Sequence, residues 1–156
     1  MVVITLLLHS ENTKLDTMNR EEIKQIMPHR EPMLLVDESQ MVGDECVSTY
    51  KVRDNEFFTQ GHFPGNPIVP GVIICEMMAQ GSVLLLKDEL TDHLALYAGI
   101  NETRFKRVVR PGDVVETHAT LVAKRGPLVL VDAIATVDGE MCCKGKLSFM
   151  LTPKQN

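Results

Sequence analysis

The residues with the clearest chemical potential lie in one loop and in the helix expected after it. The loop contains His62, and the helix contains Glu76. A histidine side chain titrates near neutral pH and can take or give a proton. A carboxyl group on an apolar helix loses solvation, which favours its uncharged, protonated form. The pair therefore predicts one base and one acid for a proton-transfer reaction.

The start of the same helix offers a third chemical group. The first N–H groups of a helix have no partner inside it, and they lie at the positive end of the helix dipole. At Gly71 and Val72 these groups could polarise a carbonyl oxygen and stabilise an enolate-like charge beside it. Removal of a proton next to a carbonyl uses all three groups. With a β-hydroxyl on the substrate, the predicted net reaction is loss of water to give a 2-enoyl product.

Each of these side chains also has a structural interpretation, which the sequence leaves open. A histidine in a loop is more often a hydrogen-bonded structural residue than a catalyst. Glu76 could pair with Gln80, one helical turn further on. Three further histidines, His9, His93 and His118, lie in terminal or polar segments or on the polar face of a strand, so we expect them at the surface.

Glycine and proline constrain the loop that carries His62. Proline fixes its own φ and favours an extended conformation in the residue before it, and glycine permits turns that other residues resist. After the loop we expect a helix over residues 72–86 that is apolar nearly all round and is therefore wrapped on most sides by the rest of the domain. The constraining residues are Gly61, Pro64, Gly65, Pro67, Pro70 and Gly71.

Short elements precede this loop. Asn19 begins a predicted capping box for a short helix that ends at Pro28. Residues 33–36 are predicted as a strand and residues 37–45 as a polar bend. Residues 46–52 alternate between apolar and polar side chains, which predicts a second strand.

The second half of the chain is predicted to be almost purely β. Turn sequences separate its expected strands, and Asp138-Gly139 is the strongest hairpin signal in the chain. The side chains of residues 114–124 alternate between two faces. This alternation places Leu121 and Ala123 on one face with every second residue before them. A run of antiparallel strands around one long helix is an α+β arrangement. The expected strands cover residues 94–100, 104–109, 114–124, 128–137 and 140–151.

Length and composition describe one ordinary domain. The chain has 156 residues, of which 44% are hydrophobic and 24% are charged, and this allows a sizeable core. We expect a single domain over residues 19–156 and an N-terminal extension of unknown role over residues 1–18. The net charge of -5 argues against general nucleic-acid binding.

Membrane insertion and metal binding are not expected either. Residues 2–8 are apolar but too short to span a bilayer, and they lack a basic leader and a cleavage site, so we predict a cytoplasmic protein. The cysteines show no CxxC or Cys/His zinc spacing, so we expect reduced thiols and no metal site. These cysteines are Cys46, Cys75, Cys142 and Cys143.

The segment HFPGNPIVPGV and the residues after it resemble the signature of the FabZ-type 3-hydroxyacyl-[acyl-carrier-protein] dehydratases. The resemblance implies a hot dog fold, in which an antiparallel sheet wraps around one long central helix. It also implies dehydration of (3R)-hydroxyacyl to trans-2-enoyl groups on acyl carrier protein in fatty acid biosynthesis. The matching residues are 62–72, Glu76, Ala79 and Gln80, with further matches at residues 28–30, Pro32, 34–37, 104–107 and 111–113.

The resemblance further implies roles for individual residues. His62 would be the catalytic base, Glu76 the acid or the water-orienting group, and the Gly71 N–H the donor that polarises the thioester. No metal is implied, and no cofactor beyond the phosphopantetheine arm of the carrier protein. The residues implied in the acyl tunnel are Phe63, Pro70, Val72, Cys75, Met77 and Met78.

The implied partners are the acyl carrier protein and further copies of this chain. The carrier protein and this chain are both acidic, and docking therefore requires a local basic patch. A strand edge exposed to solvent would show the same charges. The patch consists of Arg104, Lys106, Arg107 and Arg110. The implied assembly is a homodimer with shared active sites, built into a homohexamer as a trimer of dimers. We expect His62 of one subunit to face Glu76 of the other.

Three other functions remain open: a hot dog acyl-thioesterase, a dehydratase that also isomerises the new double bond, and a noncatalytic acyl-thioester-binding module. A thioesterase would not need His62 opposite Glu76, and a binding module would need neither residue. The chain has both, which favours dehydration. Cys75 and Met77 stand where the family commonly has isoleucine and alanine, so the preferred acyl length stays open.

Overall fold

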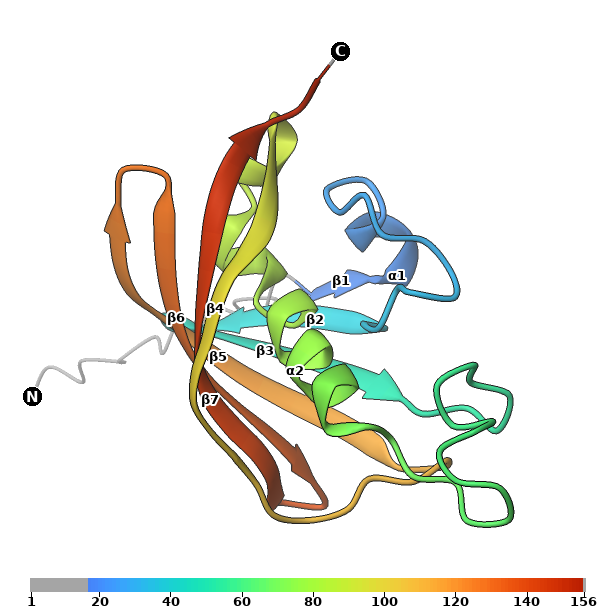
Figure 1. Ribbon diagram of the computed structural model, residues 1–156. Helices are drawn as coiled ribbons and strands as arrows, with labels where there is room; N and C mark the ends of the chain where they lie inside the picture. Colours follow the sequence, from blue (N-terminus) through green and yellow to red (C-terminus); the bar gives the residue numbers. More distant parts are fainter. Residues whose placement is uncertain (1–16, 156) are drawn as a thin grey trace, which may run out of the picture.

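A seven-stranded antiparallel sheet curls around one α-helix in the computed structural model, which describes residues 17–155 (Figure 1). The strand order is β1-β2-β3-β5-β6-β7-β4, which confirms the expected α+β arrangement. The strands are β1 (Thr17–Asn19), β2 (Glu38–Val42), β3 (Glu45–Lys51), β4 (His93–Phe105), β5 (Val114–Arg125), β6 (Leu128–Val137) and β7 (Glu140–Pro153). The helices are α1 (Arg20–Ile23), α2 (Gly71–Gln80) and the 3-10 helices η1 (Val83–Leu86) and η2 (Glu89–Thr91).

The central helix α2 packs against β5, β6 and β7 inside the curl of the sheet (Figure 1). Its buried side chains form one hydrophobic cluster with the inward-facing residues of the strands, so the core holds the helix that carries Glu76. The cluster includes Ile74, Cys75, Met77 and Met78 of α2 and Val129, Val131, Leu147 and Phe149 of the sheet. Within residues 17–155, no helix is long and apolar enough to cross a membrane.

Only part of the expected N-terminal extension lies within the described residues. Thr17 and Met18 form β1 together with Asn19, and β1 pairs with β2 at one edge of the sheet. The predicted capping box is confirmed, because the Asn19 side chain accepts from the N–H of Glu22 and the Glu22 side chain accepts from the N–H of Asn19. The apolar run at residues 2–8 lies outside the described residues.

The central α-helix is shorter than expected. It ends at Gln80, whereas the sequence predicted a helix over residues 72–86, and the last part of that range forms η1. At Gly81 the chain meets the sheet. Its carbonyl accepts a hydrogen bond from Ser48 Oγ at 2.7 Å, and a Cβ at this position would lie 2.1 Å from Thr117 Oγ1. The carbonyl is therefore bonded to the sheet instead of to a helical N–H, and the α-helix stops.

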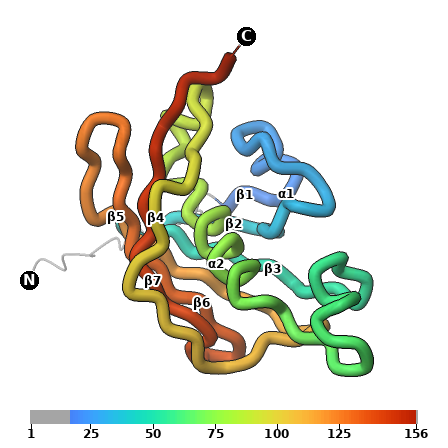
Figure 2. The backbone as a smooth tube through the Cα atoms, viewed as in Figure 1, coloured from blue at the N-terminus to red at the C-terminus, as the bar shows by residue number. Residues whose placement is uncertain are grey.

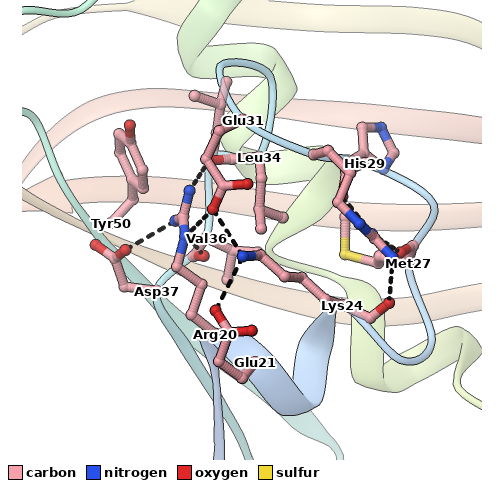
Figure 3. Close-up of polar contacts among 12 residues, drawn as sticks. Arg20, Glu21, Lys24, Met27, His29, Glu31, Leu34, Val36, Asp37 and Tyr50 are labelled. Carbon is pink, nitrogen blue, oxygen red and sulfur yellow. Dashed lines mark hydrogen bonds and ion pairs between the residues drawn. The ribbon is translucent and has the colours of Figure 1, made fainter.

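The strand predicted at residues 33–36 is wrong. Leu34, Leu35 and Val36 are buried, but they bond to side chains instead of to a neighbouring strand. The N–H of Leu35 donates to Gln80. The Arg20 guanidinium donates to the carbonyls of Leu34 and Val36 at 2.9 and 3.0 Å (Figure 3). The polar bend expected at residues 37–45 is also wrong, because most of it forms β2, which pairs with β3. The backbone of this segment can be buried without a strand partner because side chains form hydrogen bonds with its N–H and C=O groups.

The hairpin of the second half forms where the turn sequence predicted it. Asp138 and Gly139 both have positive φ, at 50° and 76°, as a two-residue turn between β6 and β7 requires. The alternation of β5 holds as far as Ala119, but a register shift follows between Leu121 and Ala123. Leu121 pairs with Val131 in the same register as Ala119 with Ala133, whereas Ala123 pairs with Leu130, so the expectation that Ala123 shares the face of Leu121 was wrong.

Strand β4 forms a free edge of the sheet. It pairs with β7 on one side and ends the strand order. The strand expected at residues 94–100 extends to Phe105, with two register shifts along it. The separate strand expected at residues 104–109 was wrong, because its first two residues end β4 and residues 106–109 form no strand. Leu96, Tyr97 and Ile100 on this strand are 51%, 38% and 44% exposed. A long free edge with apolar side chains is a template for pairing with another chain.

Candidate active site

The loop that carries His62 holds its ring in one tautomer. Nδ1 lies 3.0 Å from the carbonyl oxygen of Ile68, and the N–H of Ile68 donates to the His62 carbonyl at 2.7 Å. A carbonyl oxygen can only accept a hydrogen bond, so Nδ1 carries the hydrogen and Nε2 keeps its lone pair. The ring also stacks on Phe63, with 4.1 Å between the centroids. The imidazole is therefore oriented with a basic nitrogen available.

The loop is anchored to the segment that follows β4. Phe63 and Asn66 exchange two backbone hydrogen bonds of 2.9 Å, and the N–H of Val69 donates to the carbonyl of Val109 at 2.8 Å. The Arg110 guanidinium donates to the Asn66 side chain at 2.8 Å. Figure 2 shows the two segments side by side below α2. The position of His62 thus depends on residues far along the chain.

Glu76 is tied to the segment before β2 through one glutamine. Its side chain is 20% exposed, and Oε1 accepts a hydrogen bond from Nε2 of Gln80 at 2.8 Å. The Gln80 side chain also accepts from the N–H of Leu35 and donates to the carbonyl of Met33, both at 2.7 Å. The pairing of Glu76 with Gln80, expected as the structural alternative, is therefore present.

His29 is a residue of the site that sequence reasoning missed. Its Nε2 lies 3.5 Å from Oε1 of Glu76, and its side chain is 33% exposed. His29 belongs to the loop between α1 and β2, where no spacing pattern points toward a residue of α2. The signal that could have found it is the Pro28-His29-Arg30 match to the dehydratase signature.

An apolar cavity of about 320 Å³ opens beside Glu76. Its walls come from α2, η1, η2, β4, β7 and the loop that carries His29. A cavity with apolar walls and a few polar groups at one place suits a ligand with an apolar chain and one reactive polar end. The lining residues are Met27, Pro28, His29, Glu76, Ala79, Gln80, Ser82, Val83, Leu86, Leu90, Leu94, Ala95, Leu96, Tyr97 and Phe149.

The residues implied in the acyl tunnel lie elsewhere in the single chain. Cys75, Met77 and Met78 are buried in the core, while Phe63 and Val72 are 52% and 73% exposed. None of these five lines the cavity beside Glu76, and neither does Pro70. Their assignment to a tunnel stays a prediction, and the cavity adds side chains from η1, η2 and β4 that the sequence did not suggest.

Gly71 lies at the first turn of α2, as expected. In the described part of the chain its N–H makes no hydrogen bond, and the preceding Pro70 carbonyl accepts from the N–H groups of Ile73 and Ile74. A Cβ at Gly71 would lie 2.8 Å from Cε1 of Phe105, so glycine permits close approach of this ring to the helix start. The free N–H keeps the capacity to donate to a carbonyl oxygen.

In a single chain the two candidate catalytic residues do not share the cavity. His62 is not among the described residues that line the cavity beside Glu76. Phe63, beside His62, and Val72, one turn before Glu76, are large apolar side chains exposed to solvent. Exposed apolar surface around both groups is typical of a contact with another protein chain.

The four basic residues implied in docking divide into two kinds. Arg107 donates to the Val137 carbonyl at 2.9 Å and to Glu140 at 3.2 Å, and Arg110 holds the loop that carries His62. Arg104 and Lys106 are exposed, and within residues 17–155 neither makes an ion pair. The role of all four in docking stays a prediction.

Two groups that contact Cys75 of α2 have raised pKa values. Burial raises the pKa of Tyr97, whose hydroxyl donates to the Cys75 carbonyl at 2.7 Å. A hydrogen bond with Cys75 and burial together raise the pKa of the Cys143 thiol. All four cysteines are free and buried. Among residues 17–155 no group of three histidine, cysteine or acidic side chains is arranged to hold a metal ion.

The comparison with solved structures shows the fold. The chain is similar to the dehydratase heterocomplex ApeI:P from Xenorhabdus doucetiae, with a TM-score of 0.70 and 20% identity over 85% of this chain and 91% of that chain. It is also similar to a hypothetical thioesterase with coenzyme A from Streptococcus pneumoniae TIGR4, with a TM-score of 0.55 and 15% identity over 76% and 87% of the two chains. These likenesses show the hot dog fold.

The sequence comparison gives the family. Residues 27–146 match the FabA-like domain. The chain is 43% identical to the 3-hydroxyacyl-[acyl-carrier-protein] dehydratase FabZ of Bacillus pumilus, over 88% of this chain and 98% of the relative. It is 45% identical to the dehydratase of the same name from Caldicellulosiruptor bescii, over 85% and 98%. The chain therefore belongs to the FabA-like domain family, and its resemblance to the FabZ type is confirmed.

Proposed function

We propose that the protein dehydrates (3R)-hydroxyacyl-[acyl-carrier-protein] to trans-2-enoyl-[acyl-carrier-protein] in fatty acid biosynthesis. Relatives that are 43% and 45% identical carry the name of this dehydratase. The observation that carries the proposal is the orientation of His62, whose Nδ1 is bound to the Ile68 carbonyl so that Nε2 is left as the base. Glu76, beside an apolar cavity, supplies the carboxyl group.

The reaction begins at C2 of the acyl chain. Nε2 of His62 takes a proton from C2, and the electron pair of that C–H bond moves toward the thioester carbonyl, whose oxygen accepts a hydrogen bond from the Gly71 N–H. Glu76 gives a proton to the 3-hydroxyl group, the C3–O bond breaks and water leaves. The electron pair at C2 forms the C2–C3 double bond. His62 has gained one proton and Glu76 has lost one, so a proton transfer restores both groups.

The cavity beside Glu76 holds the acyl chain in this proposal. Val83, Leu86, Leu90 and Phe149 supply apolar wall, and burial of methylene groups against such a wall favours binding by about 0.8 kcal/mol per CH₂. The phosphopantetheine arm of the carrier protein delivers the thioester to Gly71. Both proton transfers use side chains of the protein, so the proposed reaction needs no further cofactor.

Two subunits build each site in this proposal. The free edge of β4 pairs with β4 of a second copy, which extends the sheet and covers Leu96 and Ile100. His62 of one subunit then faces Glu76 of its partner, in agreement with the absence of His62 from the described lining of the cavity. The family resemblance adds that three such dimers form a homohexamer.

The acyl carrier protein docks on the basic patch of Arg104, Lys106, Arg107 and Arg110. This protein has a net charge of -5, so attraction of an acidic partner requires a local concentration of positive charge. Arg104 and Lys106 are the exposed members that remain available for a partner's carboxylates. Arg107 and Arg110 contribute charge while they hold the neighbouring hairpin and loop.

The test is incubation with 3-hydroxyacyl-carrier-protein substrates of several chain lengths, followed by mass spectrometry of the carrier protein. Loss of one water with the acyl group still attached supports dehydration. Release of a free acid indicates a thioesterase, and an unchanged substrate indicates a binding module; either result contradicts the proposal. Chromatography of the enoyl products against 2-enoyl and 3-enoyl standards shows whether the double bond is also isomerised.

Two variants connect the reaction to the named residues. His62→Ala and Glu76→Gln should each lower the turnover number by about 10²-fold or more, which is the usual effect of losing a general acid or base. Thermal unfolding of each variant provides the control for folding. A folded His62→Ala protein with a near-normal rate would contradict the mechanism.

A further inference from the structure

Two N–H groups from different parts of the chain approach one oxygen of Glu76. Gln80 donates from the same helix to Oε1 at 2.8 Å, and Nε2 of His29 lies 3.5 Å from that oxygen. Oε2 makes no hydrogen bond with a described residue. The carboxyl group is thus approached on one side, and its second oxygen is left for the substrate.

The tautomer of His29 follows from its other nitrogen. Among the described residues, Nδ1 of His29 is a buried atom without a hydrogen-bond partner. A buried N–H without a partner is rare, whereas an unused acceptor is tolerated more often. The hydrogen of the neutral ring is therefore on Nε2, which is the nitrogen that faces Oε1 of Glu76. His29 presents a donor to this carboxyl group.

The loop that carries His29 is held firmly enough to fix this donor. The Arg30 guanidinium donates to the carbonyls of Met27 at 2.9 Å and of Lys24 at 3.1 Å. Figure 3 shows the ion pairs that hold the same loop, in which Arg20 and Lys24 both bind Glu31. These contacts hold the loop to α1 and to the residues that follow it, so the position of the ring does not depend on its contact with Glu76 alone.

We propose that His29 is a positioning residue for the dehydration, which donates from Nε2 to Oε1 of Glu76 and stabilises the carboxylate that forms when Glu76 gives up its proton. This inference rests on the proposed function of Glu76. A hydrogen bond to a carboxylate is about twice as strong as one to a neutral group, so the donor favours the ionised state that develops in the reaction. The 3.5 Å separation fits a contact that shortens as charge develops on Oε1.

The alternative is that His29 only forms part of the cavity wall. In that case its replacement would weaken binding of the acyl chain and raise KM, with little effect on kcat. The positioning role predicts the reverse, because the contact becomes strong only as the proton leaves Glu76. Whether replacement of His29 changes kcat or KM therefore distinguishes the two roles.

Three substitutions test the position of the donor. His29→Gln places an amide nitrogen where Nε2 lies, whereas His29→Asn is too short to reach Glu76, and His29→Ala removes the group. We expect the glutamine variant to stay within about 3-fold of the wild-type kcat, and the asparagine and alanine variants to lose about 10-fold or more with an unchanged KM. Equal effects of glutamine and asparagine, or a change confined to KM, would overturn the inference. Thermal unfolding verifies that each variant is folded.

A double-mutant cycle tests whether His29 acts through Glu76. In a Glu76→Gln background no carboxylate forms, so adding His29→Asn should change the residual kcat by less than about 2-fold. A full additional loss in that background would overturn the inference. The proposed function is tested separately, because it fails when wild-type protein does not dehydrate the substrate. The inference about His29 fails when wild-type and Glu76→Gln proteins behave as expected and the His29 variants do not.

Discussion

Replacement of Gln80 by leucine tests whether one side chain joins the helix of Glu76 to the segment before β2. Gln80 is 3% exposed and makes three hydrogen bonds, with Leu35, Met33 and Glu76. Leucine has a similar size but can make none of them. The substitution therefore removes the polar connection and keeps most of the packing.

The expected loss of stability can be estimated from these bonds. The Leu35 N–H becomes a buried donor without a partner, which costs about 1–3 kcal/mol. Each of the other two bonds contributes about 0.5–1.5 kcal/mol, and the added apolar surface of leucine offsets part of the sum. We expect Gln80→Leu to lower the free energy of unfolding by roughly 2–4 kcal/mol, a large part of the 5–15 kcal/mol typical of a domain.

Urea unfolding at one fixed protein concentration measures this loss. The matched control is Gln25→Leu, the same change at an exposed position, which should stay within about 0.5 kcal/mol of wild type. A Gln80→Leu protein as stable as the Gln25→Leu protein would refute the conclusion that Gln80 joins the helix to the loop. A loss of kcat in the same variant would follow from the freed Glu76.

Three other regions give separate predictions. Gly81→Ala should lower the free energy of unfolding by more than about 1 kcal/mol in urea titrations, because the new Cβ would lie 2.1 Å from Thr117 Oγ1. In NMR titrations His118 should have a pKa above 6.5, because burial lowers the pKa but hydrogen bonds to two glutamates raise it more. The stability that it contributes is present below pH 6.5 and is lost as the pH rises through the folded-state pKa. In steady-state kinetics, reversing the charges of Arg104 and Lys106 should raise KM for carrier-protein substrates and barely change it for pantetheine thioesters.

Each of these three predictions has a control and an opposing result. A Cβ added at Gly61 would have no atom within 4 Å, so Gly61→Ala is the control. An equal loss of unfolding free energy in this variant would contradict the steric explanation for Gly81→Ala. Glu45→Gln together with Glu116→Gln should lower the histidine pKa, and an unchanged titration would contradict the assignment of its cause. Lys87→Glu is the control for the basic residues and should leave KM unchanged. An equal rise in KM with carrier-protein substrates and with pantetheine thioesters would instead assign the basic residues to folding or to the chemistry.

The features that the sequence predicted well have a local physical cause. Asp138-Gly139 forms a hairpin because these residues tolerate positive φ, and the capping box at Asn19 joins groups that are three residues apart. The proline and glycine residues before α2 likewise mark the loop that holds His62. The matching signature then supplied the fold and the reaction, both of which the comparisons support.

The features that the sequence did not reveal depend on contacts between distant residues. Leu35 and Gln80 are 45 positions apart, and their hydrogen bond explains why an apolar segment that resembled a strand is not one. The end of α2 depends on contacts of Gly81 with the sheet. His29 approaches Glu76 from another loop, and no periodicity within one element records such a contact.

The shared site is tested most directly by mixing two inactive proteins. His62→Ala and Glu76→Ala subunits are prepared separately and exchanged by reversible dissociation, with exchange verified by pull-down of a tagged subunit. Random exchange makes about half of the dimers mixed, and each mixed dimer has one site with both natural residues, so about a quarter of the wild-type dehydration rate should return. A rate that stays at the level of the separate variants after verified exchange would contradict a site built from His62 of one subunit and Glu76 of the other.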